Sequence, residues 1–229
     1  MKRLFTGIVL LAGSLAIMPA HAFLLDGFGD AQDGILDNQD DGTAVTSGDI
    51  NVSDTDFTSV KRTLTVERTG GAATEGSDDV GTVSAAVAGG WYQYSQDTQT
   101  RGTGAVDWTF GPEMFGSPIN LLLSVIEADR PGAEVKLELT NADGTFSDSM
   151  VLPEVNSAQD FLFTVSGFDT SKPFTSARLS VNGETISALD VTVDFIEIPA
   201  PGVLGLLGIG LAGLAFAARR KRDTEVAAV

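Results

Sequence analysis

The sequence predicts an all-β protein whose body is an antiparallel β-sandwich, and three observations lead to this prediction. Apolar and polar residues alternate with a period of two in successive runs along the body. Clusters of Gly, Asn, Asp and Pro separate these runs, as turns do. No segment of the body shows sustained helical periodicity. Many short strands bury their apolar faces between two packed sheets, and we favour the jelly-roll form over an immunoglobulin-like one.

The N-terminal segment, residues 1–22, is typical of a secretory signal peptide. It consists of a basic start at Lys2 and Arg3, an apolar run over 4–18, and the cleavage residues Ala20, Ala22 and Phe23. The apolar run is short for a membrane span, and Pro19 interrupts it. We therefore expect a signal helix that the secretion machinery removes, which leaves a mature N-terminus at Phe23.

The body, residues 23–198, is expected to form one domain, because about 175 residues suffice for a single core. Residues 23–56 are rich in Asp, Gly and Asn and predict loops with short strands. Ten strand candidates follow, at 63–67, 80–87, 91–95, 105–110, 120–126, 135–140, 145–151, 161–165, 177–181 and 189–195. Turn signals lie between them, including Gly70-Gly71, Gly89-Gly90 and Asn182-Gly183. The continuous run 121–123 indicates a central strand covered on both faces, or a strand that begins beneath a loop.

The charge of the body excludes one class of partner. Residues 23–198 contain eight basic and 29 acidic residues, a net charge of −21. Such a surface repels nucleic acid and anionic lipid, and it attracts divalent cations or basic partners. We therefore expect no nucleic-acid binding.

The body also lacks the side chains of most hydrolytic and metal sites. There is no cysteine, and the only histidine, His21, lies in the signal peptide. Ser-His-Asp and Cys-His catalysis and the usual transition-metal sites are therefore unavailable to the mature chain. A pair of carboxylates cannot be selected from 29 acidic residues, so we expect a protein that is not an enzyme and has no cofactor.

Two candidate sites follow from the residues of the body. A structural Ca²⁺ site would form if the first and last strands meet and bring Asp26 close to Asp190 or Asp194, whereas the loop 37–48 fails the EF-hand pattern. The alternative is that these carboxylates are solvated. A glycan-binding face is suggested by Trp91, Tyr92 and Tyr94, because exposed rings stack on sugars. Strand alternation places Trp91 and Gln93 on one side and both tyrosines on the other, and the alternative is that the rings fill the core.

The C-terminal sequence predicts a membrane-sorting segment, residues 199–222, followed by a short tail, 223–229. Its motif is Pro199, Ala200 and Pro201, and its basic cluster is Arg219, Arg220, Lys221 and Arg222. The 17 residues between them carry no charge, and as a helix they would measure about 25 Å, enough for a short transmembrane helix. The basic cluster would stop transfer and leave the body outside. One helix face is lined by the small residues Gly205, Gly208, Ala212 and Ala215, which would let another helix pack closely.

This order of motif, helix and basic cluster resembles the PEP-CTERM sorting signal, with Ala200 in place of the usual Glu. The resemblance implies recognition by exosortase, a membrane-embedded cysteine protease and transpeptidase, and transfer of the body to the envelope or exopolysaccharide. The opening segment 24–28, the strand 60–64, the Gly89-Gly90 pair and the closing strand 190–194 look like secreted jelly-roll modules that often accompany this signal.

The sequence therefore predicts a protein exported to the cell surface or envelope of a bacterium through a transient membrane intermediate. Its expected role is structural or adhesive, in contact with exopolysaccharide or a biofilm matrix. Two alternatives are a carbohydrate-binding module or carbohydrate-active enzyme, and a surface protein that stays permanently anchored.

Overall fold

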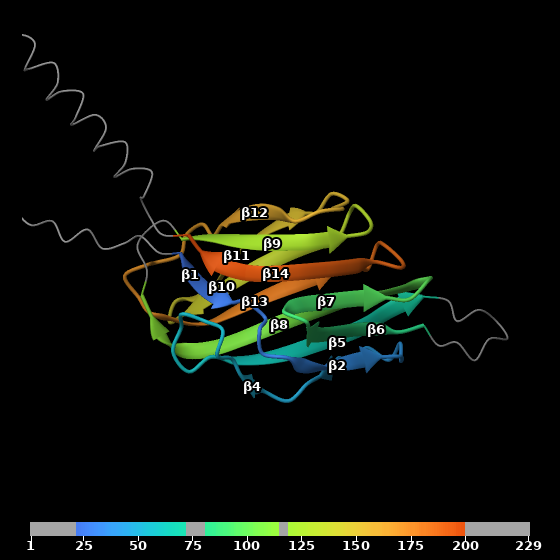
Figure 1. Cartoon of the computed structure of the whole chain (residues 1–229), viewed down its shortest axis with the longest axis horizontal. Helices are drawn as coiled ribbons and strands as arrows, with labels where there is room; N and C mark the ends of the chain where they lie inside the picture. The colour runs from blue at the N-terminus through green and yellow to red at the C-terminus, as the bar shows by residue number, and fades with distance from the viewer. Residues whose placement is uncertain (1–21, 72–80, 115–118, 200–229) are drawn as a thin grey trace, which may run out of the picture.

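The computed structural model describes residues 22–71, 81–114 and 119–199, which form two facing β-sheets (Figure 1). Every strand pair in both sheets is antiparallel. Within the described residues there are fourteen strands and no helix. The predicted all-β antiparallel sandwich is confirmed.

Each sheet has seven strands. Sheet A contains β1 (Phe23–Asp26), β2 (Gln32–Asp37), β6 (Val83–Ala88), β7 (Trp91–Gln96), β9 (Asn120–Ala128), β12 (Gln159–Thr164) and β14 (Asp190–Ile198). Sheet B contains β3 (Val45–Thr46), β4 (Ile50–Asn51), β5 (Lys61–Gly71), β8 (Thr100–Glu113), β10 (Glu134–Asn141), β11 (Gly144–Val151) and β13 (Phe174–Asn182). The predicted strands are all present, although β8 is longer than expected.

The strands β7 to β14 have the connectivity of a jelly roll. In sheet A the order is β12-β9-β14-β7, and in sheet B it is β11-β10-β13-β8. The last two strands, β13 and β14, thus insert between strands formed earlier in the chain, as in a pair of Greek keys. The earlier strands β2 to β6 widen both sheets beyond β7 and β8.

The core lies between the sheets and follows the period of two. In β10, for example, Val135, Leu137 and Leu139 are buried while the residues between them are partly exposed. The 121–123 run is in a central strand, as predicted, but its outer face is not covered: Leu122 is half-buried there, whereas Leu121 and Leu123 enter the core. The expected turn at Gly70-Gly71 is wrong, because both residues belong to β5 and pair with Arg101 and Thr100 of β8.

The first and last strands of the body lie side by side. β1 pairs with β14, and Phe23 is opposite Ile198, so the described chain begins and ends at the same point of sheet A. Several predicted features fall outside the described residues: the signal residues before Ala22, the motif beyond Pro199, the basic cluster and the small-residue helix face. Among the described residues, no helix is long and apolar enough to cross a membrane.

Candidate functional site

The two sheets differ sharply in the charges that their strands carry. All six Lys and Arg residues of the described strands lie in sheet B: Lys61, Arg62, Arg68, Arg101, Lys136 and Arg178. The strands of sheet A carry no cation, and their acids outside the core are Asp33, Glu127, Asp160, Asp190, Asp194 and Glu197. Arg62 and Arg68 point into the core, and the other four cations give this acidic protein one mixed-charge face, the outer face of sheet B.

A shallow depression lies at the centre of this face. Its lining comes from three neighbouring strands and the edge strand β11: Asp107, Trp108 and Thr109 of β8, Ser176, Ala177 and Arg178 of β13, Glu138 and Thr140 of β10, and Thr145 of β11. Strand alternation turns the apolar neighbours of these residues inward and leaves the polar side chains facing solvent. The depression is consequently lined by charges and hydroxyl groups.

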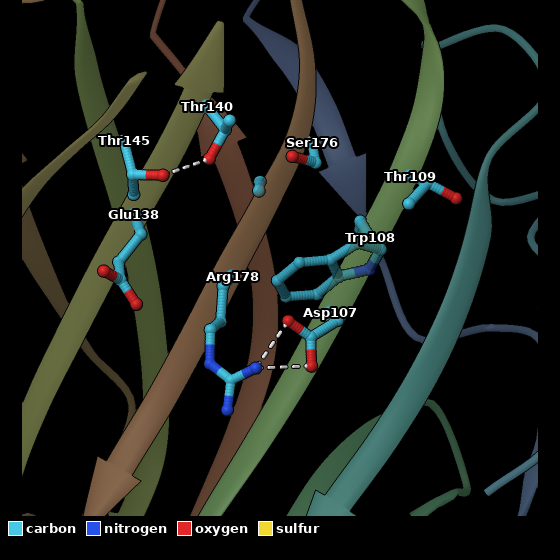
Figure 2. A pocket seen from close by; sticks show the side chains of 9 residues that line it. Asp107, Trp108, Thr109, Glu138, Thr140, Thr145, Ser176 and Arg178 are labelled. Atoms are coloured by element: carbon cyan, nitrogen blue, oxygen red, sulfur yellow. Dashed lines mark hydrogen bonds and ion pairs between the residues drawn. The ribbon is translucent and has the colours of Figure 1, made fainter. Parts of the chain in front are cut away.

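A row of three charged residues crosses the depression. Glu138, Arg178 and Asp107 are direct register partners on β10, β13 and β8, so their side chains share one face. Figure 2 shows Arg178 between the two carboxylates. Nη1 of Arg178 donates to both carboxylate oxygens of Asp107, at 2.7 and 2.8 Å. Glu138 forms an ion pair with Lys136, in which Nζ lies 2.8 Å from Oε1. The two cations and two carboxylates balance one another.

Part of the hydrogen-bonding capacity of this row remains available. No bond from Nε or Nη2 of Arg178 is found within the described chain, and its side chain is 41% exposed. Beside the row, the hydroxyls of Thr140 and Thr145 bond to each other at 2.8 Å (Figure 2). Thr109 and Ser176 are register partners and add two more hydroxyls. The depression thus presents fixed donors and acceptors in alternation, a surface suited to binding hydroxyl groups.

The structure separates the three aromatic residues that suggested a glycan-binding face. Trp91 is 41% exposed, whereas Tyr92 and Tyr94 are fully buried in the core. The expected division of this strand into two sides is confirmed, but the tyrosines are ruled out as sugar-stacking residues. Burial raises the pKa of both phenols. Trp91 lies on the outer side of sheet A, away from the depression.

The candidate calcium residues are not brought together. β1 and β14 do meet, but Asp26 pairs with Ile196 and turns into the core. Asp190 instead lies beside Ser95 of β7 and donates its backbone N–H to Asp129. Among the described residues no group of three His, Cys, Asp or Glu residues is placed to hold a metal.

The carboxylate of Asp26 has a structural partner that sequence reasoning missed. Arg62, which is also fully buried, donates from Nη1 to Asp26 Oδ2 at 2.7 Å, and the indole Nε1 of Trp108 donates to the same oxygen at 2.7 Å. Burial raises the pKa of the Asp26 carboxyl, and these donors act against that shift. One signal was visible: Arg62 occupies an inward position in the alternating strand 61–67.

Comparisons with known proteins identify no family. No family model matches the sequence, and no curated protein matches it. Among solved structures, a family 29 carbohydrate-binding module complexed with mannohexaose has a TM-score of 0.35 and 14% identity, over 51% of this chain and 75% of the module. Another family 29 module has a TM-score of 0.35 and 16% identity, over 51% of this chain and 73% of the module. PfGH50B has a TM-score of 0.40 and 10% identity, over 52% of this chain and 22% of PfGH50B.

Proposed function

We propose that this protein is an exported surface module that binds a neutral polysaccharide through the outer face of sheet B. The observation that carries the proposal is the row Glu138–Arg178–Asp107, whose charges Lys136 balances, in a depression rimmed by threonine and serine hydroxyls. The role is binding rather than catalysis.

The chemistry of the row favours a polyhydroxylated ligand. A sugar hydroxyl donates one hydrogen bond and accepts others, so it matches a surface on which carboxylates, hydroxyls and an arginine alternate. The free donors of Arg178 are charged and fixed by Asp107, which makes them strong and pre-oriented partners. The charges of the row are balanced by Lys136, and the surrounding body has a net charge of −21, so an anionic polymer is disfavoured.

The two terminal segments support a location at the cell envelope. The signal residues 1–22 and the PEP-CTERM-like segment 199–222 support export, a transient membrane intermediate and processing by exosortase. The pairing of Phe23 with Ile198 supports this location, because the two proposed processing points would then lie at one end of the sandwich. The body would therefore be attached to the envelope at a single point and leave the outer face of sheet B free for polysaccharide.

A glycan array tests the binding proposal. The mature chain, labelled on its N-terminal amine, should bind one or more neutral hexose polymers. Binding should persist at high salt because the row together with Lys136 carries no net charge. Binding only to anionic polymers, or to none, would contradict the proposal.

Intact mass spectrometry tests the sorting proposal separately. Protein recovered from the envelope of the native cell should begin at Phe23 and should have lost residues from the motif at 199–201 onward. A mass that includes residues 202–229 would instead show a permanently anchored protein.

A further inference from the structure

The outer face of sheet A carries an apolar patch that belongs to no core. It consists of Leu24, Leu122, Leu162 and Phe195, on β1, β9, β12 and β14. Leu162 is 53% exposed, and none of the four packs against the core between the sheets. A strand face usually alternates apolar inside with polar outside, so such a cluster on the outer side calls for a covering group.

Register places the patch in two adjoining rows, with the Glu197 carboxylate between Leu122 and Leu24. Leu162 pairs with Leu122, Leu122 pairs with Glu197, and Glu197 pairs with Leu24, so these side chains form one row across four strands. Phe195 lies in the adjoining row, opposite Ser124. As the register partner of Phe195, Ser124 faces the same side, and it is only 3% exposed.

The charges around the patch limit what can cover it. Sheet A has no cation on any described strand, and Asp160 and Glu197 stand within or beside the patch. A second copy of a body with a net charge of −21 would be repelled, and so would an anionic lipid surface. The covering group should be apolar and should carry positive rather than negative charge.

One segment of this chain has that composition and begins beside the patch. Residues 202–218 are uncharged and apolar, and the four basic residues at 219–222 follow directly. Glu197, in the patch row, is one residue before the end of β14 at Ile198. Residues 199–204, if extended, reach about 20 Å beyond the end of β14. Leu162 lies two strands from Glu197, which is about 10 Å across the sheet. The segment can therefore reach the whole patch.

We propose that the outer face of sheet A holds the chain's own C-terminal segment while that segment is in water. Residues 202–218 lie over Leu24, Leu122, Leu162 and Phe195, and the basic cluster meets the acids of sheet A. The contact shields the apolar segment in chains that are not inserted in a membrane. It is independent of the polysaccharide face, which lies on the opposite sheet.

Cysteine cross-linking tests this contact without interference, because the chain contains no native cysteine. The chain 23–229 carrying Leu162→Cys and Leu204→Cys, purified without detergent, should form an intramolecular disulfide under mild oxidation. The matched control is Ser147→Cys with Leu204→Cys, because Ser147 is an exposed residue on the outer face of sheet B. We expect oxidation at least tenfold faster for the Leu162 pair.

Three outcomes would overturn the proposal. Equal oxidation rates for the two pairs would show an unbound segment. Disulfides that join two chains would show that a second copy covers the patch. A chain that remains soluble only in detergent would show that the patch does not shield the segment.

Discussion

At the scale of single residues, Arg62 is the side chain that ties the two sheets together. It belongs to β5 in sheet B, and it binds Asp26 on β1 and Gln32 on β2, both in sheet A. Nη2 donates to the backbone oxygen of Asp30 as well. An ion pair removed from water is stabilising only when its remaining donors and acceptors are also satisfied, and this network meets that condition. Its main effect is therefore to fix how sheet A lies on sheet B.

Replacing Arg62 should destabilise the sandwich strongly. Arg62→Met leaves the Asp26 carboxylate buried without its cation, which we expect to lower the free energy of unfolding by about 3 to 5 kcal/mol. Urea denaturation of the mature chain measures this change. The control is Arg130→Met, which removes an exposed cation whose ion pair to Asp129 measures 3.9 Å and should leave the midpoint almost unchanged. Equal midpoints for the two variants would show that the buried pair does not stabilise the fold.

Glu197 should make stability depend on pH. Burial, and to a lesser extent the charge of Asp160, raise the pKa of this carboxyl above its ordinary value of 4.5. The folded state then holds the proton more tightly than the unfolded state, so the stabilisation is complete below the unfolded pKa and is lost as the pH rises through the folded pKa. Glu197→Gln should raise Tm at pH 7 and leave it unchanged at pH 3. Melting curves at both pH values check this, and an equal difference at both would contradict it.

At the scale of elements, β8 controls how closely the sheets approach. Gly104 faces the rings of β7, and a Cβ there would lie 2.3 Å from Cδ2 of Tyr94 and 3.0 Å from the hydroxyl of Tyr92. A strand with a side chain at this position would push the tyrosines out of the core. The glycine is thus required by close packing.

Gly104→Ala should therefore lower the free energy of unfolding by about 1 to 3 kcal/mol, the usual cost of overpacking. Gly70→Ala in β5 is the matched control, since its Cβ would meet no atom within 4 Å. Chemical denaturation of both variants provides the measurement. If Gly104→Ala were no less stable than Gly70→Ala, the two tyrosines would not be packed as described.

The same elements show what sequence patterns can and cannot predict. Period-two alternation was sufficient to locate strands such as β10 and β13, because one face of each is buried. It could not decide which side of β7 enters the core, since both sides carry aromatic rings. β2 was not separated from the loops of 23–56, because two polar residues, Gln32 and Asp37, occupy its buried positions.

The candidate site was less predictable than the fold. Asp107, Glu138 and Arg178 are ordinary polar residues on outward strand positions, and nothing in their local sequence distinguishes them from solvated ones. Their proximity depends on the register of three strands that are far apart in the chain. Only the pairing of β8, β13 and β10 creates the row.

At the scale of the whole molecule, the sandwich separates three properties. Sheet B carries the strand cations and the polar depression, sheet A carries the uncompensated acids and the apolar patch, and one end of the sandwich carries both ends of the body. In this arrangement a ligand on sheet B, a covering segment on sheet A and an attachment point do not compete for the same surface.

Isothermal titration of a neutral polysaccharide against Arg178→Met tests whether the row on sheet B binds the polysaccharide. Removing the guanidinium deletes the free donors of the row and leaves Asp107 without its partner, so affinity should fall at least tenfold, or about 1.4 kcal/mol. Arg130→Met, which removes the same type of charge from a loop outside sheet B, should bind as the unaltered chain does. We expect Arg178→Met alone to lose binding. Equal affinities for the two variants would contradict a site at Arg178 and place the polysaccharide elsewhere.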